Sequence, residues 1–88
     1  MVANWLPLPA TEHSRVGVIT SRRIGDAVRR SRARRLLRES FRRHQHDLVT
    51  PLDLVLVARP SITGMRFREV ETDFLKAMKR GHLLKQLD

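Results

Sequence analysis

The chain has 88 residues, which suits one small domain over residues 1–88 with a thin hydrophobic core. It contains no cysteine, and this excludes disulfides, thiolate metal sites and thiol catalysis. The formal net charge is +9, and an excess of this size predicts a polyanionic partner.

The composition also bears on where the protein works. No apolar stretch approaches the roughly 20 residues that span a membrane, and the first twenty residues lack the pattern of a signal peptide. Small secreted domains usually depend on disulfides, so we expect a cytoplasmic protein with no membrane partner.

Two short strands are predicted ahead of the first helix. Residues 2–8 are apolar, with Pro7 near their end and Pro9 directly after them, and this predicts a strand that ends at proline. Residues 15–20 are β-branched and apolar, which predicts a second strand. Core packing is the simpler interpretation of Trp5, and stacking on an RNA base is the alternative.

The strongest pattern in the sequence is a basic amphipathic helix over residues 27–44. Gly25 breaks the pattern after the second strand, and Asp26 is a suitable N-cap. On a helical wheel, one side is apolar or small and the opposite side is almost purely guanidinium. The first side comprises Ala33, Leu36, Leu37, Ser40 and Phe41, and the second Arg34, Arg35, Arg38 and Arg42.

The positive charge is concentrated in this part of the chain. Residues 15–43 contain eleven arginines and two acidic residues, so this segment accounts for the whole net charge. Stability would favour acidic side chains at the start of a helix, yet Arg29, Arg30 and Arg32 stand in its opening turns. Backbone N–H groups and guanidinium groups together form an anion site, and phosphate is the expected ligand.

A buried strand and a second helix are predicted after the basic helix. Residues 54–58 form a continuous apolar run, typical of a strand covered on both faces. Residues 66–80 repeat apolar side chains at helical spacing, with Glu71 as the polar exception, and Gly81 suits the C-cap. The order of elements predicts the α/β (α+β) class, a two-layer sandwich in which a small sheet packs with two helices.

The stretch from Ser21 to Glu39, SRRIGDAVRRSRARRLLRE, resembles the signature of the protein subunit of bacterial ribonuclease P. That family shows a basic pair, a glycine, an Ala-Val step, an Arg-Asn-Arg core, a second basic pair and Arg-Glu. The likeness covers about residues 14–80 and includes an Ala-Arg-Pro that ends at Pro60.

The resemblance implies a division of labour within a ribonucleoprotein. The RNA subunit hydrolyses the phosphodiester bond with magnesium that it binds itself, and the protein helps to hold the 5′ leader of precursor tRNA. The holoenzyme is then an endonuclease of tRNA processing, and the protein supplies no catalytic residue and no metal ligand. No small-molecule substrate is implied.

The same resemblance assigns the RNA-binding residues by position. They are Arg22, Arg23, Arg30, Ser31, Arg32, Arg34, Arg35 and Arg38. We expect alanine at both Arg30 and Arg32 to weaken function and to leave the fold intact.

Two features depart from the family pattern. Ser31 stands where the family has asparagine, and serine lacks the reach and the second donor of the amide. The family also has an N-terminal helix and strand ahead of the segment that matches residues 2–8. We therefore expect an N-terminally shortened domain with an exposed sheet edge and marginal solubility.

The residues by themselves leave other functions open. A non-enzymatic RNA-binding module, such as a ribosomal protein, would use the same basic helix. A DNA-binding regulator is less well supported, because helix-turn-helix proteins place a helix, not a strand, before the recognition helix. A self-sufficient nuclease would need a paired general acid and base, which Asp26, Glu39, Asp47 and Asp53 do not form.

Overall fold

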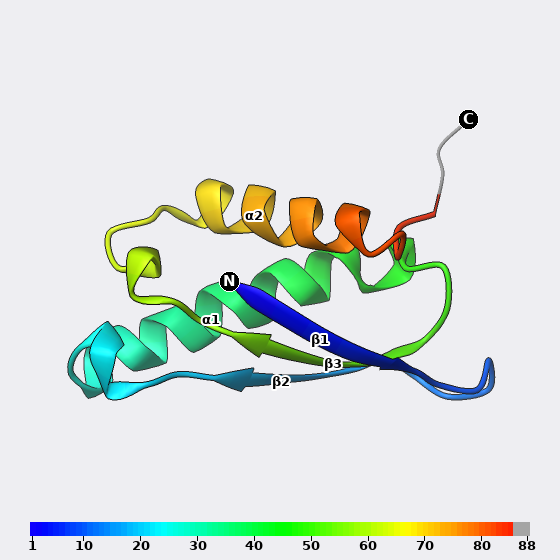
Figure 1. The fold of residues 1–88 in the computed structure, drawn as a ribbon, viewed down its shortest axis with the longest axis horizontal. Coiled ribbons are helices and arrows are strands. Elements are labelled where there is room, and N and C mark those ends of the chain that lie inside the picture. Colours follow the sequence, from blue (N-terminus) through cyan, green and yellow to red (C-terminus); the bar gives the residue numbers. More distant parts are fainter. Residues whose placement is uncertain (86–88) are drawn as a thin grey trace.

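The computed structural model describes residues 1–85, and its main elements follow the predicted order (Figure 1). The strands are β1 (Val2–Pro7), β2 (Arg15–Ile19) and β3 (Leu52–Val57), and the α-helices are α1 (Ala27–His44) and α2 (Phe67–Arg80). Short 3₁₀ helices lie in the connections, namely η1 (Arg22–Ile24), η2 (Gln45–Asp47) and η3 (Pro60–Ile62). The predicted α/β (α+β) sandwich of a small sheet and two helices is confirmed.

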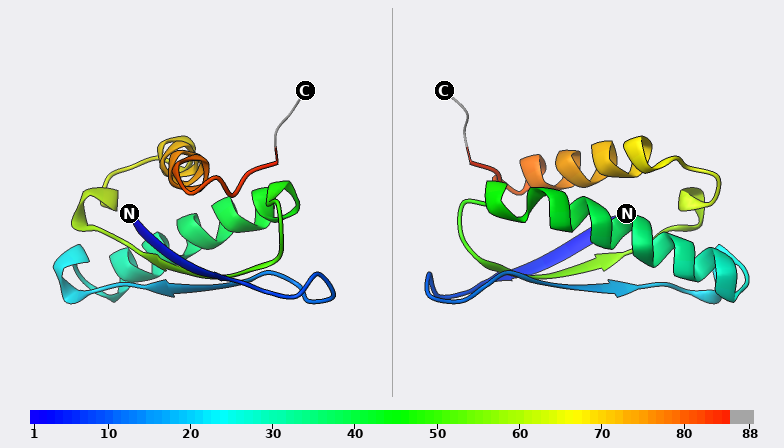
Figure 2. Two further views of the ribbon diagram at one scale, coloured as in Figure 1. Left: turned by 45° about the vertical axis from the view of Figure 1, so that its right-hand side comes forward. Right: turned by 180° about the vertical axis from the view of Figure 1, so that it is seen from behind.

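The three strands form one mixed sheet in the order β1–β3–β2. The central strand β3 is antiparallel to β1 and parallel to β2, and its Leu54 lies opposite both Trp5 and Val16. The chain connects β2 to β3 through α1, and both helices lie on the same side of the sheet (Figure 2). The strands β1 and β2 are the two edges of this sheet.

Burial alternates along the central strand. Its helix-facing side chains, Leu52, Leu54 and Leu56, are fully buried, whereas Val55 and Val57 on the other face are half-buried. The prediction that this strand is covered on both faces is therefore wrong for residues 1–85. Both helices lie on one side of the sheet. The continuous apolar run of this strand is therefore not evidence that a second layer covers its other face.

The core lies between the sheet and the two helices. Leu37 and Phe41 of α1 and Phe74 and Met78 of α2 are buried in it, as the helical spacing predicts. Packing of these apolar faces, more than helix propensity, stabilises two helices of this length.

A histidine at the end of α1 joins the two helices. The Nε2 atom of His44 lies 3.0 Å from a carboxylate oxygen of Glu71 in α2, and Nδ1 lies 3.2 Å from Asp47. Which ring nitrogen donates depends on the tautomer of the imidazole. This contact explains why polar Glu71 interrupts the apolar pattern of α2.

Candidate RNA interface

The basic helix begins where the sequence predicts. The carboxylate of Asp26, the N-cap, accepts a hydrogen bond from the backbone N–H of Arg29 at 2.9 Å. Gly25 has a φ of 131°, a backbone conformation that residues with a side chain rarely adopt. The side chain of Arg29 lies directly over it. These two residues set the direction in which α1 leaves η1.

Part of the predicted site is an exposed stripe along α1. Ser31, Arg35 and Arg38 are exposed and follow one another at i, i+4 and i+7, so they share one face of the helix. Arg22 and Arg23 are exposed in the preceding η1 turn. No hydrogen bond or ion pair within residues 1–85 engages these four guanidinium groups, which leaves them available to an anion.

Three other predicted contacts are half-buried and hydrogen-bonded. Arg30 donates from Nη1 to the carbonyl of Gly25 at 3.1 Å, Arg32 donates from Nη2 to the carbonyl of Met65, and Arg34 donates from Nη1 to the hydroxyl of Thr20 at 2.7 Å. Each of these bonds uses one of the five N–H donors of a guanidinium, so further donors remain for phosphate.

These bonds bear on the expected effect of alanine at Arg30 and Arg32. Each guanidinium satisfies a backbone carbonyl, and Arg32 connects α1 to Met65, just before α2. A substitution there removes a structural bond as well as a positive charge. We therefore expect the double substitution to lower the free energy of unfolding as well as to weaken RNA binding.

Positive charge near the C-terminal end of α1 is partly neutralised within the helix, because Arg42 and Arg43 share one carboxylate. The carboxylate of Glu39 accepts hydrogen bonds from Nε of Arg42 at 2.9 Å and from Nε of Arg43 at 3.0 Å. The hydrogen bond from Arg42 and then that from Arg43 lower the pKa of Glu39 to about 2. The guanidinium of Arg43 also lies 4.5 Å from the centre of the Phe67 ring.

The helix face predicted from the wheel is therefore not uniformly available. Of its four arginines, Arg42 is paired with Glu39 and Arg34 gives one of its donors to Thr20, so only Arg35 and Arg38 are without a partner within residues 1–85. The exposed guanidinium groups of α1 that have no hydrogen-bond partner within residues 1–85 are therefore those of Arg29, Arg35 and Arg38.

The RNA contacts assigned by the resemblance omit Arg29, although the anion site predicted at the start of the helix includes it. Its side chain is exposed, and with Arg32 it lines a hollow of about 250 Å³ that Thr63 and Gly64 close on the other side. Its place in the first helical turn was the available signal, because the backbone dipole makes that position attractive to anions.

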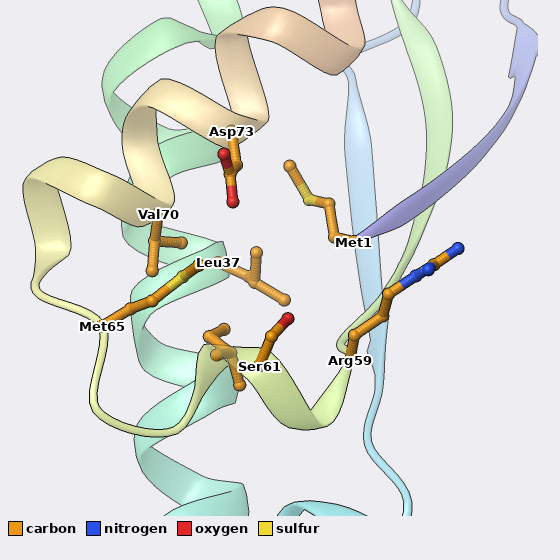
Figure 3. Close-up of a pocket in the computed structure, with 8 residues that line it drawn as sticks. Met1, Leu37, Arg59, Ser61, Met65, Val70 and Asp73 are labelled. Carbon is orange, nitrogen blue, oxygen red and sulfur yellow. The ribbon is translucent and has the colours of Figure 1, made fainter.

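A second hollow is separate from the basic face (Figure 3). It lies beside η3, is lined by Leu37, Met65 and Val70 among others, and the carboxylate of Asp73 points toward it. Its volume is about 20 Å³, which is room for about one water molecule. This hollow is too small to bind a substrate.

Residues 1–85 contain no group of three or more histidine or acidic side chains placed to hold a metal ion. Within the same residues, neither helix is long and apolar enough to cross a lipid bilayer.

Comparison with known proteins connects this geometry to a family. The family model described as Ribonuclease P matches residues 2–82. The ribonuclease P protein component of Brevibacillus brevis is 42% identical over 72 residues, covering 82% of this chain and 57% of the relative. That of Listeria welshimeri is 33% identical over 85 residues, covering 97% of this chain and 71% of the relative.

Solved structures show the same fold. The RNase P protein of Thermotoga maritima superimposes with a TM-score of 0.75 at 27% identity, covering 89% of this chain and 74% of that one. The RNase P protein of Staphylococcus aureus superimposes with a TM-score of 0.80 at 22% identity, covering 94% and 75%. The chain spans 57% and 62% of the length of the curated relatives from Brevibacillus brevis and Pelotomaculum thermopropionicum.

Proposed function

Because this chain belongs to the ribonuclease P protein family, we propose that it is the RNA-binding subunit of a ribonuclease P. In this proposal it assists a catalytic RNA in the endonucleolytic removal of the 5′ leader from precursor tRNA. The ribonuclease P RNA and the precursor tRNA are its two partners.

One observation of this chain carries the proposal. Four exposed guanidinium groups, those of Arg22, Arg23, Arg35 and Arg38, have no partner within residues 1–85, although the two other exposed arginines at the end of α1 share Glu39. Unpaired guanidinium groups on one face repel each other and weaken the folded state. Their arrangement is suited to bidentate bonds with phosphate oxygens, which Arg forms better than Lys.

The bond cleavage itself is assigned to the RNA. The chemistry of phosphodiester hydrolysis needs groups that activate water and stabilise the departing oxygen, and the guanidinium groups of α1 stay protonated and cannot act as a general base. Magnesium, which usually keeps several waters and binds phosphate oxygens, would be held mainly by the RNA subunit. The protein's part is to bind and orient RNA, and to neutralise phosphate charge near the reacting bond.

The proposal is tested by adding the chain to a bacterial ribonuclease P RNA and measuring precursor tRNA cleavage at low magnesium. We expect faster cleavage at the mature 5′ end, because guanidinium groups replace part of the charge neutralisation that magnesium otherwise provides. Circular dichroism confirms that the added chain is folded. A folded chain that binds the RNA without accelerating cleavage would favour a non-enzymatic RNA-binding module such as a ribosomal protein.

A further inference from the structure

Thr20 lies where the sheet meets the basic helix. It follows β2 directly and is half-buried, and the carbonyl of Ile19 beside it accepts a hydrogen bond from the N–H of Ala58 at 2.9 Å. Its hydroxyl oxygen accepts the Nη1 donor of Arg34 at 2.7 Å. A strand end that is anchored to the sheet thus holds a long side chain from α1.

This contact distinguishes Arg34 from the exposed arginines of the same helix. Arg35 and Arg38 have no such partner within residues 1–85, so they are free to sample several rotamers. Ordering a flexible side chain during binding opposes association by about 0.5–1.5 kcal/mol. Threonine is β-branched and stiff at its first side-chain torsion, so its hydroxyl is a well-defined anchor.

We propose that Thr20 is a positioning residue of the RNA interface, which orients the guanidinium of Arg34 for phosphate before RNA binds. The hydroxyl uses one of the five donors of Arg34, and the remaining donors are left for phosphate oxygens. The inference rests on the proposed function, because it takes Arg34 as an RNA contact.

The first test compares Thr20→Val, which removes the hydroxyl and keeps the shape, with Thr20→Ser, which keeps the hydroxyl. The Kd for a fluorescently labelled bacterial ribonuclease P RNA is measured at several salt concentrations. We expect Thr20→Val to weaken binding by about 2- to 10-fold and Thr20→Ser to bind like the original chain.

The salt dependence separates positioning from loss of charge. Arg34→Ala should lower the slope of log affinity against log salt by about one, because one phosphate contact is lost. Thr20→Val should leave that slope unchanged, since the charge of Arg34 is retained. A slope that changes with Thr20→Val would overturn the inference.

A double-mutant cycle separates positioning from direct contact. In the Arg34→Ala background, Thr20→Val should have no further effect on affinity, because the side chain that Thr20 orients is absent. If the two substitutions weaken binding independently, Thr20 acts on RNA by another route and the inference is wrong.

Folding is controlled with a matched variant. The hydroxyl of Thr72 in α2 donates to the carbonyl of Arg68 in the same helix at 2.9 Å, so Thr72→Val also loses one hydroxyl bond and should retain full affinity. Should Thr20→Val fail to fold, Thr20→Ala provides a second variant without the hydroxyl.

The outcomes also distinguish this inference from the proposed function. If Arg34→Ala binds RNA as tightly as the original chain, Arg34 is not an RNA contact. The assignment of Arg34 to the RNA interface and the positioning role of Thr20 are then both wrong. If Arg34→Ala weakens binding and folded Thr20→Val does not, only the positioning role is overturned.

Discussion

The indole ring of Trp5 packs directly on Gly81. A Cβ atom added at Gly81 would lie 2.9 Å from Cη2 of the ring, closer than real side chains approach. Gly81 is the C-cap of α2 as predicted, but its φ is −82°, a value that any residue adopts. The close approach of Trp5 from β1, and not a left-handed backbone, is therefore what requires glycine here.

Replacing Gly81 with alanine should displace the indole ring and lower the free energy of unfolding by about 1 kcal/mol, since overpacking outweighs the entropic gain of alanine. Trp5 is the only tryptophan, so its fluorescence reports the displacement directly. Gly17→Ala is the matched control, because nothing lies within 4 Å of a Cβ atom there. Equal stability and unchanged emission in Gly81→Ala would show that the contact is not a constraint.

The double variant Arg35→Ala/Arg38→Ala should bind ribonuclease P RNA about tenfold more weakly or worse. Its slope of log affinity against log salt should be lower by about two, because two exposed guanidinium groups no longer displace counterions. Fluorescence anisotropy at several salt concentrations measures both quantities.

A control with the same loss of charge is Arg68→Ala/Arg80→Ala, since both of these residues are exposed on α2. Binding should weaken much less in this variant if the interface lies on α1. Equal losses in the two double variants would mean that total charge, and not its position, governs affinity.

Arg32→Ala should lower the free energy of unfolding by about 1–2 kcal/mol, because it leaves the half-buried carbonyl of Met65 without its charged donor. Denaturant unfolding measures this change. Arg35→Ala, which removes an exposed guanidinium of the same helix, should change stability by less than about 0.5 kcal/mol. Identical stabilities would show that Arg32 has no structural role.

The pairing of Glu39 predicts a pH dependence of stability. Its folded-state pKa is lowered from 4.5 to about 2, first by the hydrogen bond from Arg42 and then by that from Arg43. A lowered pKa means that the stabilising contribution is complete above pH 4.5 and is lost as the pH falls toward 2. Thermal unfolding of the original chain and of Glu39→Gln should therefore converge as the pH falls through this range. A difference between the two proteins that stays constant with pH would contradict the pairing.

The element order and the two faces of α1 could be predicted because they depend on local periodicity. Asp26 as N-cap, the helix over residues 27–44 and the alternation of apolar and basic positions are all properties of adjacent turns. Strand boundaries were less accurate, since the predicted strand 54–58 begins at Leu52, where pairing with Pro7 of β1 extends it. Pairing between distant strands is not encoded in the pattern of either one.

The sequence alone determined that this chain has a concentrated arginine surface and the signature of the ribonuclease P protein family. Only the tertiary structure decided how the arginines differ from one another. Arg32 reaches a carbonyl 33 residues away and Arg34 a hydroxyl 14 residues away, whereas Arg35 and Arg38 stay exposed. Residue type sets the charge of a guanidinium, but its partners depend on which distant backbone and side-chain atoms the folded chain brings within hydrogen-bond distance.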